Sequence, residues 1–167
     1  MAKLSFNLSD RIVVTAPVHI KVPQSVKTTS AGKTDTRFVT QTVFLDFEVP
    51  KQDDLDELAE EIRRENREFS DKISDAVERR RSATTDDERS GIDAEIAELN
   101  RGIRNAGVEQ LKRFVVGLPE NHGIGDEGAE AEFSTGLIER LCQYEFVRAA
   151  MLETLQGLIN GGAKRGN

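Results

Sequence analysis

Two stretches near the N-terminus alternate apolar and polar residues, a pattern that predicts half-buried β-strands. They cover residues 12–22 and 38–49, and the Ser-, Thr-, Lys- and Gly-rich residues 23–35 between them predict a long hairpin loop. Pro17 lacks an N–H group, so we expect the first strand at a sheet edge or at a bulge. The resulting antiparallel ribbon should pack on its own helices or on another subunit, because two strands alone are marginally stable. An exposed ribbon edge could also accept a strand from a partner protein.

Apolar residues recur at helical spacing after the second strand and predict a charged helical hairpin over residues 51–106. Thr85 and Glu88 form a capping box that opens the second helix of this hairpin. A coiled-coil seam follows in that helix, at Ile92, Ile96, Leu99 and Ile103. The short connection favours antiparallel packing within the chain, but the same four residues could form an oligomerisation seam with another copy. Gly102 and Gly107 are expected to weaken the end of the second helix.

The C-terminal helical region, residues 107–160, contains an apolar segment, a glycine-rich acidic loop and two helical stretches. Ser134 stands where an N-cap is expected, so a helix should begin directly after it. The apolar register shifts near residues 143–145, which predicts two consecutive helices or one kinked helix. Residues 161–167 have no apolar anchor and predict a disordered tail. The predicted fold class is α+β, with an N-terminal antiparallel β-ribbon (residues 1–50) and a mainly α-helical body in one compact domain overall.

Composition narrows the class of protein further. A chain of 167 residues is long enough for one hydrophobic core. Its formal net charge of −7 argues against nonspecific nucleic-acid binding, which depends on clustered Lys and Arg. No apolar run approaches the ~20 residues of a membrane span, and the N-terminus lacks the apolar stretch of a signal peptide. We therefore expect the protein to stay inside the cell that makes it, which suits the single Cys142 as a packed thiol.

Two short motifs suggest chemistry, but neither has the context that its chemistry needs. Three glycines match the dinucleotide-binding spacing: Gly123, Gly125 and Gly128. No parallel-strand unit precedes them, and acidic neighbours would repel phosphate. A histidine and three carboxylates lie close together in the sequence: His122, Asp126, Glu127 and Glu130. Their spacing fits neither a calcium loop nor a zinc motif, so we predict no catalytic, cofactor-binding or metal site and interpret the protein as non-enzymatic.

The C-terminal half also contains an ordered series of parts. They are the Val-Val-Gly of residues 115–117, the Asp-Glu-Gly of residues 126–128, the pair Phe133 and Ser134, and a small-residue helix over 146–159. In this order the chain resembles the phage tail assembly chaperones over about a third of its length, and more weakly over residues 44–58. It departs from the family pattern just after the Val-Val-Gly segment. Many members have a tryptophan there, whereas this chain has Leu118 and Pro119 and contains no Trp.

The resemblance implies a non-enzymatic chaperone of the host cytoplasm that binds the tape measure protein and keeps it soluble while the tail tube polymerises. It implies a homo-oligomer without nucleic acid or membrane, and the major tail tube protein as a further candidate partner. Apolar contacts and surplus negative charge suit such a role. The candidate client-binding residues are Val115, Val116, Leu118, Phe146, Met151 and Leu155, which could equally be core residues. The alternative is an oligomeric structural or adaptor component of a phage particle, closed by the coiled-coil seam.

Overall fold

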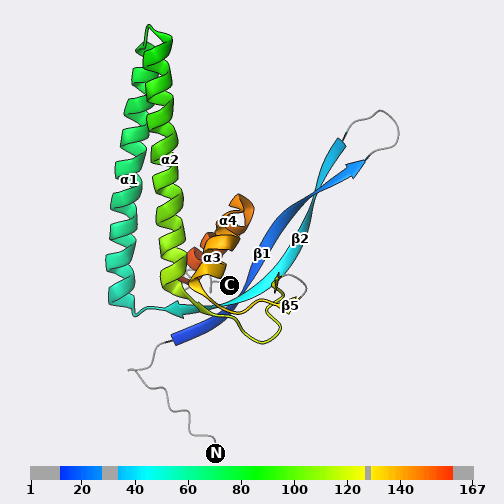
Figure 1. Cartoon of the computed structure of the whole chain (residues 1–167). Coiled ribbons are helices and arrows are strands. Elements are labelled where there is room, and N and C mark those ends of the chain that lie inside the picture. Colours follow the sequence, from blue (N-terminus) through cyan, green and yellow to red (C-terminus); the bar gives the residue numbers. More distant parts are fainter. Residues whose placement is uncertain (1–11, 28–33, 127–128, 160–167) are drawn as a thin grey trace, which may run out of the picture. The chain divides into compact units, whose positions relative to one another are not determined.

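The computed structural model describes residues 12–27, 34–126 and 129–159 (Figure 1). Its elements are β1 (Ile12–Lys27), β2 (Thr34–Val49), α1 (Gln52–Ser82), α2 (Asp86–Phe114), β3 (Val115–Gly117), β4 (Gly125–Asp126), β5 (Ala129–Glu130), α3 (Thr135–Cys142) and α4 (Glu145–Ile159). An N-terminal antiparallel sheet combined with helices confirms the predicted α+β class. The described residues form two compact units. We call those within 1–50 and 111–167 the sheet unit, and residues 51–110 the hairpin unit.

β1 and β2 form the antiparallel ribbon that the alternating pattern predicts, and both strands are longer than expected. β1 continues to Lys27 and β2 begins at Thr34, so the ladder extends into the stretch predicted as a loop. The remainder of that predicted loop, residues 28–33, lies outside the described residues, as does the predicted tail at 161–167. β3 pairs with the other side of β2, which leaves β1 at the edge of the three-stranded sheet, one of the two positions predicted from Pro17.

The prolines of β1 explain why the strands extend so far. Pro17 is the partner of Phe44, whose backbone N–H points away from β1 and donates to the His122 carbonyl oxygen at 2.9 Å. Because hydrogen-bonding directions alternate along an antiparallel pair, Pro17 faces the free edge of β1. Pro23, six residues further on, faces the same way. Neither proline therefore removes a hydrogen bond between the two strands, and the ladder passes through both.

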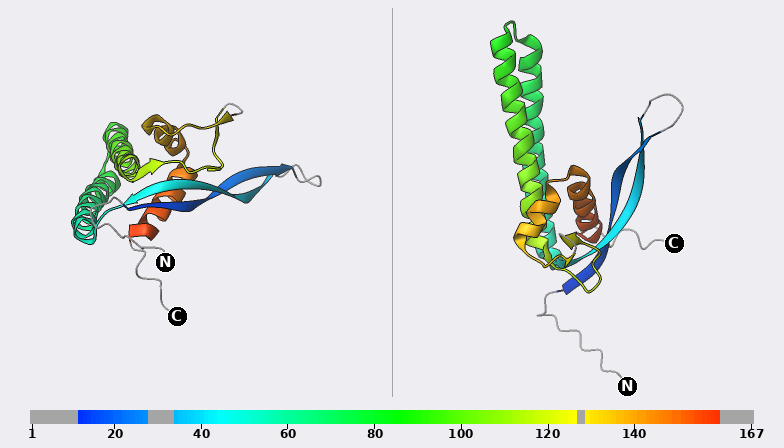
Figure 2. Two further views of the ribbon diagram at one scale, coloured as in Figure 1. Left: turned by 90° about the horizontal axis from the view of Figure 1, so that it is seen from below. Right: turned by 45° about the vertical axis from the view of Figure 1, so that its right-hand side comes forward.

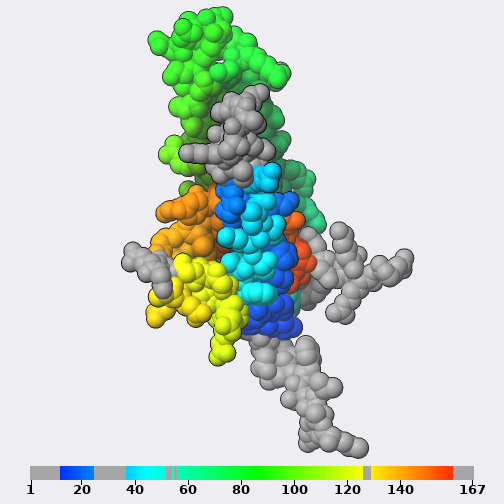
Figure 3. All heavy atoms as spheres, turned by 90° about the vertical axis from the view of Figure 1, so that its right-hand side faces the viewer, coloured from blue at the N-terminus to red at the C-terminus, as the bar shows by residue number. Residues whose placement is uncertain are grey.

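The core of the sheet unit lies between one face of the ribbon and α4, which packs across β1 and β2 (Figure 2). Buried residues on this face of the ribbon are Ala16, Val18, Ile20, Leu45 and Phe47. On α4, Met151 and Leu155 are buried as well. Fully burying a large apolar side chain contributes about 1.5–3 kcal/mol, so this layer stabilises a ribbon that would be marginal alone. Figure 3 looks onto the opposite face of the ribbon, most of whose residues are exposed.

The two C-terminal helices begin and end where local signals predict. The Ser134 side chain accepts a hydrogen bond from the Leu137 backbone N–H at 3.1 Å, which confirms the predicted N-cap. α3 ends at Cys142 and α4 begins at Glu145, which confirms two consecutive helices. The turn between them exposes 60% of the Tyr144 side chain, and its ring lies 5.8 Å from that of Phe146.

In the hairpin unit, α1 and α2 run antiparallel, side by side (Figures 1 and 2). Arg79 pairs with Glu95 at 2.6 Å, and two of the three Arg80 guanidinium nitrogens, Nε and Nη2, donate to the Asp93 carboxylate. α2 continues to Phe114, whereas the sequence predicts a weakened end near residue 106. Contact with the Phe69 ring explains why a glycine is accommodated at Gly102, because a Cβ atom there would lie 3.0 Å from Cε1 of that ring.

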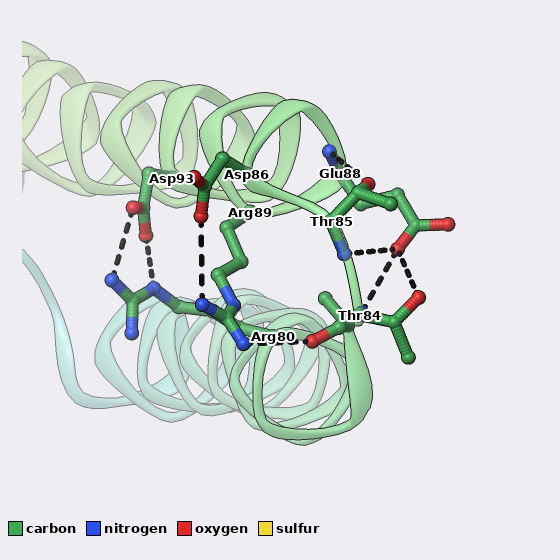
Figure 4. Close-up of polar contacts among 8 residues, drawn as sticks. Arg80, Thr84, Thr85, Asp86, Glu88, Arg89 and Asp93 are labelled. Carbon is green, nitrogen blue, oxygen red and sulfur yellow. Dashed lines mark hydrogen bonds and ion pairs between the residues drawn. The ribbon is translucent and has the colours of Figure 1, made fainter.

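The start of α2 is closed by the predicted capping box (Figure 4). The Glu88 N–H donates to the Thr85 hydroxyl at 3.2 Å, and the Glu88 carboxylate accepts from the Thr85 N–H at 3.2 Å and the Thr84 N–H at 3.0 Å. These backbone donors lower the pKa of the Glu88 carboxyl, that of Thr85 most. A hydrogen bond from Arg80 lowers the pKa of the Asp93 carboxyl in the same way. The connection between the helices is therefore fixed by charge-assisted hydrogen bonds.

Substituting two glycines of α2, exposed Gly91 and half-buried Gly102, tests the close contact at Gly102. Gly91→Ala should raise the free energy of unfolding of the hairpin by about 0.5–1 kcal/mol, because the new methyl group meets nothing within 4 Å. Gly102→Ala should gain less than this or lose stability, because the Phe69 ring must move. Thermal unfolding followed by circular dichroism at 222 nm compares the two variants. Equal gains would contradict the close contact between Gly102 and the Phe69 ring.

Acid should lower the stability of the hairpin, because the pKa values of the Glu88 and Asp93 carboxyls are lowered in the folded state. A carboxyl whose pKa is lower in the folded state stabilises that state above its unfolded pKa, about 4.5 for Glu88, and this contribution disappears as the pH falls toward the folded value. We expect the melting temperature to fall between about pH 5 and pH 3. Glu88→Gln in α2 should show a shallower fall, whereas Glu65→Gln, which removes an exposed carboxylate of α1, should follow the unmodified protein. Parallel curves for all three proteins would contradict the role of the capping box.

Candidate functional site

A pocket of about 300 Å³ opens in the sheet unit, between the α4-facing side of the ribbon, the loop after β3 and the junction of α3 and α4. The ribbon contributes five lining residues: Ile20, Val22, Gln41, Val43 and Leu45. The loop contributes Gly123, Ile124 and Gly125. The helices contribute Leu141, Tyr144, Phe146, Val147 and Met151. Only Gln41 and Tyr144 among these side chains carry a polar group, and none carries a charge, so the pocket suits an apolar ligand group.

The loop wall of the pocket is attached to the ribbon by His122, a buried residue with 5% exposure. Its carbonyl oxygen accepts from the Phe44 N–H, and its Nδ1 accepts from the Ile124 backbone N–H at 3.1 Å. Nδ1 must therefore be unprotonated, and its lone pair is not available to a metal ion. The loop then turns back, because the Ala131 N–H donates to the Ile124 carbonyl oxygen at 3.1 Å. Ile124 is thereby held in the pocket wall, 8% exposed.

Gly123 makes the turn of this loop. Its φ is +77°, a conformation that side chains other than glycine rarely adopt, and a Cβ atom there would lie 3.4 Å from the Thr42 carbonyl oxygen. Asn121, with φ of 60°, precedes it in the left-handed region that Asn tolerates. The residue types at Asn121 and Gly123 therefore determine the backbone conformation of this wall.

The six candidate client-binding residues occupy different environments. Val115, Met151 and Leu155 are buried, with exposures of 2%, 0% and 3%. Leu118 and Phe146 are half-buried, and Val116 is 36% exposed. Only Phe146 and Met151 line the pocket, one near its opening and the other fully buried in its wall.

The seam residues lie along α2 and face α1 of the same chain. Ion pairs from Arg80 to Asp93 and the close approach of Phe69 to Gly102 fix an antiparallel register for the two helices. This register places the seam alongside half-buried Phe69 and Ile73 and buried Ala76 of α1. Half-buried seam residues are Ile92, Ile96 and Leu99, and Ile103 is 39% exposed.

The single cysteine and His19 lie in surroundings that fit a structural role. Cys142 is buried, and this burial raises the pKa of its thiol to about 11, so little reactive thiolate forms at neutral pH. His19 Nδ1 lies 3.0 Å from the Thr42 hydroxyl on the exposed face of the ribbon. Within the described ranges, His, Cys, Asp and Glu nowhere gather in a group of three that could hold a metal ion.

Sequence reasoning missed most of the pocket. The sequence predicts the lining residues of β1 and β2 only as one face of a ribbon. It marks the glycines of the loop only as a chance match to the dinucleotide-binding spacing. Tyr144 is the one signal that could have indicated the opening. It is an aromatic residue at the predicted break between two helices, where neither apolar stripe accounts for it.

No family model, curated protein or solved structure matches this chain. Of the helices in the described part of the chain, none has the length and apolar character that crossing a membrane requires.

Two glycines of the loop provide a matched test of the pocket wall. Gly123→Ala should lower the free energy of unfolding of the sheet unit by about 1–2 kcal/mol, because the new side chain disfavours a positive φ. Gly125→Ala should change it little, because the nearest atom to its Cβ, the Ala129 carbonyl oxygen, lies at 3.7 Å. Urea unfolding followed by fluorescence of Tyr144, the single tyrosine in a chain without tryptophan, reports on this unit. An equal loss in both variants would contradict the fixed turn at Gly123.

Proposed function

We propose that the protein is a viral tail assembly chaperone that binds the tape measure protein, keeps it soluble and assists tail tube polymerisation. The observation that carries this proposal is the apolar pocket of the sheet unit, which has exposed Tyr144 and half-buried Phe146 at its opening. A protein that prevents aggregation needs an apolar surface that a client can enter and leave. The order of parts from residue 115 to residue 159, which resembles that of the tail assembly chaperones, supports the choice of client.

The charge of the chain supports the same role. Its net charge of −7 would keep a complex with many copies of the protein in solution. Many weak contacts along one long client can together give strong binding, because each bound segment raises the effective concentration of the next. We propose that the protein acts in this way in the host cytoplasm, without catalysis.

A second candidate function is an oligomeric structural or adaptor component of a phage particle. The exposed 39% of Ile103, at the end of the seam, favours it, since a second copy could cover this side chain. An assembly chaperone leaves the finished particle, whereas an adaptor remains in it at fixed stoichiometry.

Co-expression with the tape measure protein of the same phage distinguishes these functions. Size-exclusion chromatography with light scattering should show a soluble complex with several copies of this protein per client, under conditions in which the client alone is insoluble. A fixed oligomer of the same mass with and without the client would contradict the chaperone function and favour the adaptor.

A further inference from the structure

The size and lining of the pocket suit one or two apolar side chains of another protein better than a whole cofactor. Its volume of about 300 Å³ lies at the lower limit for small-molecule sites. Its wall offers no charged group to orient a polar or anionic ligand. Gln41 and Tyr144, the only polar side chains in the lining, are both exposed. An apolar side chain of another protein would meet apolar contacts throughout the interior.

The surroundings of the pocket carry surplus negative charge. Glu130 is exposed and pairs across β4 and β5 with Gly125, a lining residue, and exposed Glu132 follows two residues later. The arginines of the neighbouring helices are already engaged, and exposed Arg37 lies on the same face of the ribbon as Gln41, four residues before it in β2. The largely buried Arg148 pairs with Glu145, and Arg140 takes part in another interaction. Lys21 lies on the opposite face of the ribbon, because side chains alternate along a strand and its neighbours Ile20 and Val22 line the pocket.

The edge of the ribbon argues against a partner that binds as an added β-strand. Such a strand needs a continuous row of backbone donors and acceptors along β1. Pro17 and Pro23 face this free edge and supply no N–H group, so the row is interrupted twice. A helix needs no such row, because its backbone groups are already hydrogen-bonded internally.

We infer that the pocket binds the apolar face of an amphipathic helix whose remaining surface is rich in Lys and Arg. One or two large apolar side chains enter between Phe146 and Val43, and the basic residues beside them meet Glu130 and Glu132. This inference rests on the proposed function in that it names the kind of client segment the chaperone would hold.

A single tryptophan placed at the pocket tests the inference, because the chain has none of its own. Gln41→Trp introduces the probe at an exposed lining position, and Thr40→Trp introduces it at the next residue, exposed on the opposite face. Both full-length proteins are titrated with two synthetic helical peptides of about five turns. The peptides share one leucine face, and the rest of their surface carries lysine in one and glutamate in the other.

The lysine peptide should shift the emission of Gln41→Trp to shorter wavelength and leave Thr40→Trp unchanged. The glutamate peptide should bind about tenfold more weakly. Adding Glu130→Lys and Glu132→Lys to the Gln41→Trp protein should remove or reverse this preference. Both substituted positions are exposed, and circular dichroism checks that the variant keeps its fold. Equal binding of the two peptides, equal responses of the two probes, or no binding would each overturn the inference.

The outcome is separable from that of the proposed function. If the tape measure protein forms a soluble complex but leaves the Gln41→Trp emission unchanged, the chaperone function holds and the pocket is not its client site. If the lysine peptide enters the pocket but the tape measure protein forms no complex, the pocket assignment holds and the proposed client is wrong.

Discussion

A two-stranded ribbon in water leaves both of its faces exposed to solvent and is marginally stable at best without a cover. In the sheet unit α4 provides that cover, because Met151 and Leu155 pack where Val18, Leu45 and Phe47 are buried. The cover is incomplete beyond Ile20, where the face continues to Val22. The loop that His122 attaches to β2 encloses this remaining surface without filling it. The pocket is thus a consequence of a ribbon that is longer than the helix layer packed on it.

The hairpin unit is stabilised largely by local interactions. A capping box at Thr85 and Glu88, ion pairs between the helices and a narrow apolar seam determine its length and its direction. Most of its surface is charged and exposed, and individual surface ion pairs contribute only a few tenths of a kcal/mol. Its stability should therefore depend more on pH and salt than that of the sheet unit, whose core is apolar.

Local signals in the sequence predict the elements, and long-range geometry determines the site. The Ser134 cap and the break before Glu145 depend on neighbouring residues, and each is found as predicted. The missing N–H group of Pro17 predicts an edge or a bulge, and the strand is found at an edge. The ribbon length is not predicted, because it depends on which way Pro23 faces. The pocket is not predicted either, because it requires Val43 and Phe146, about a hundred residues apart, to lie together.

The methionine methyl groups test directly the proposal that client segments enter this pocket. The chain contains two methionines, Met1 and Met151, and Met151 lines the pocket. With ¹³C-methyl methionine labelling, nuclear magnetic resonance spectra are recorded for the free protein and for the soluble complex with the tape measure protein. We predict that the Met151 signal changes in the complex. A Met151 signal that stays unchanged in a complex of confirmed composition would contradict the claim.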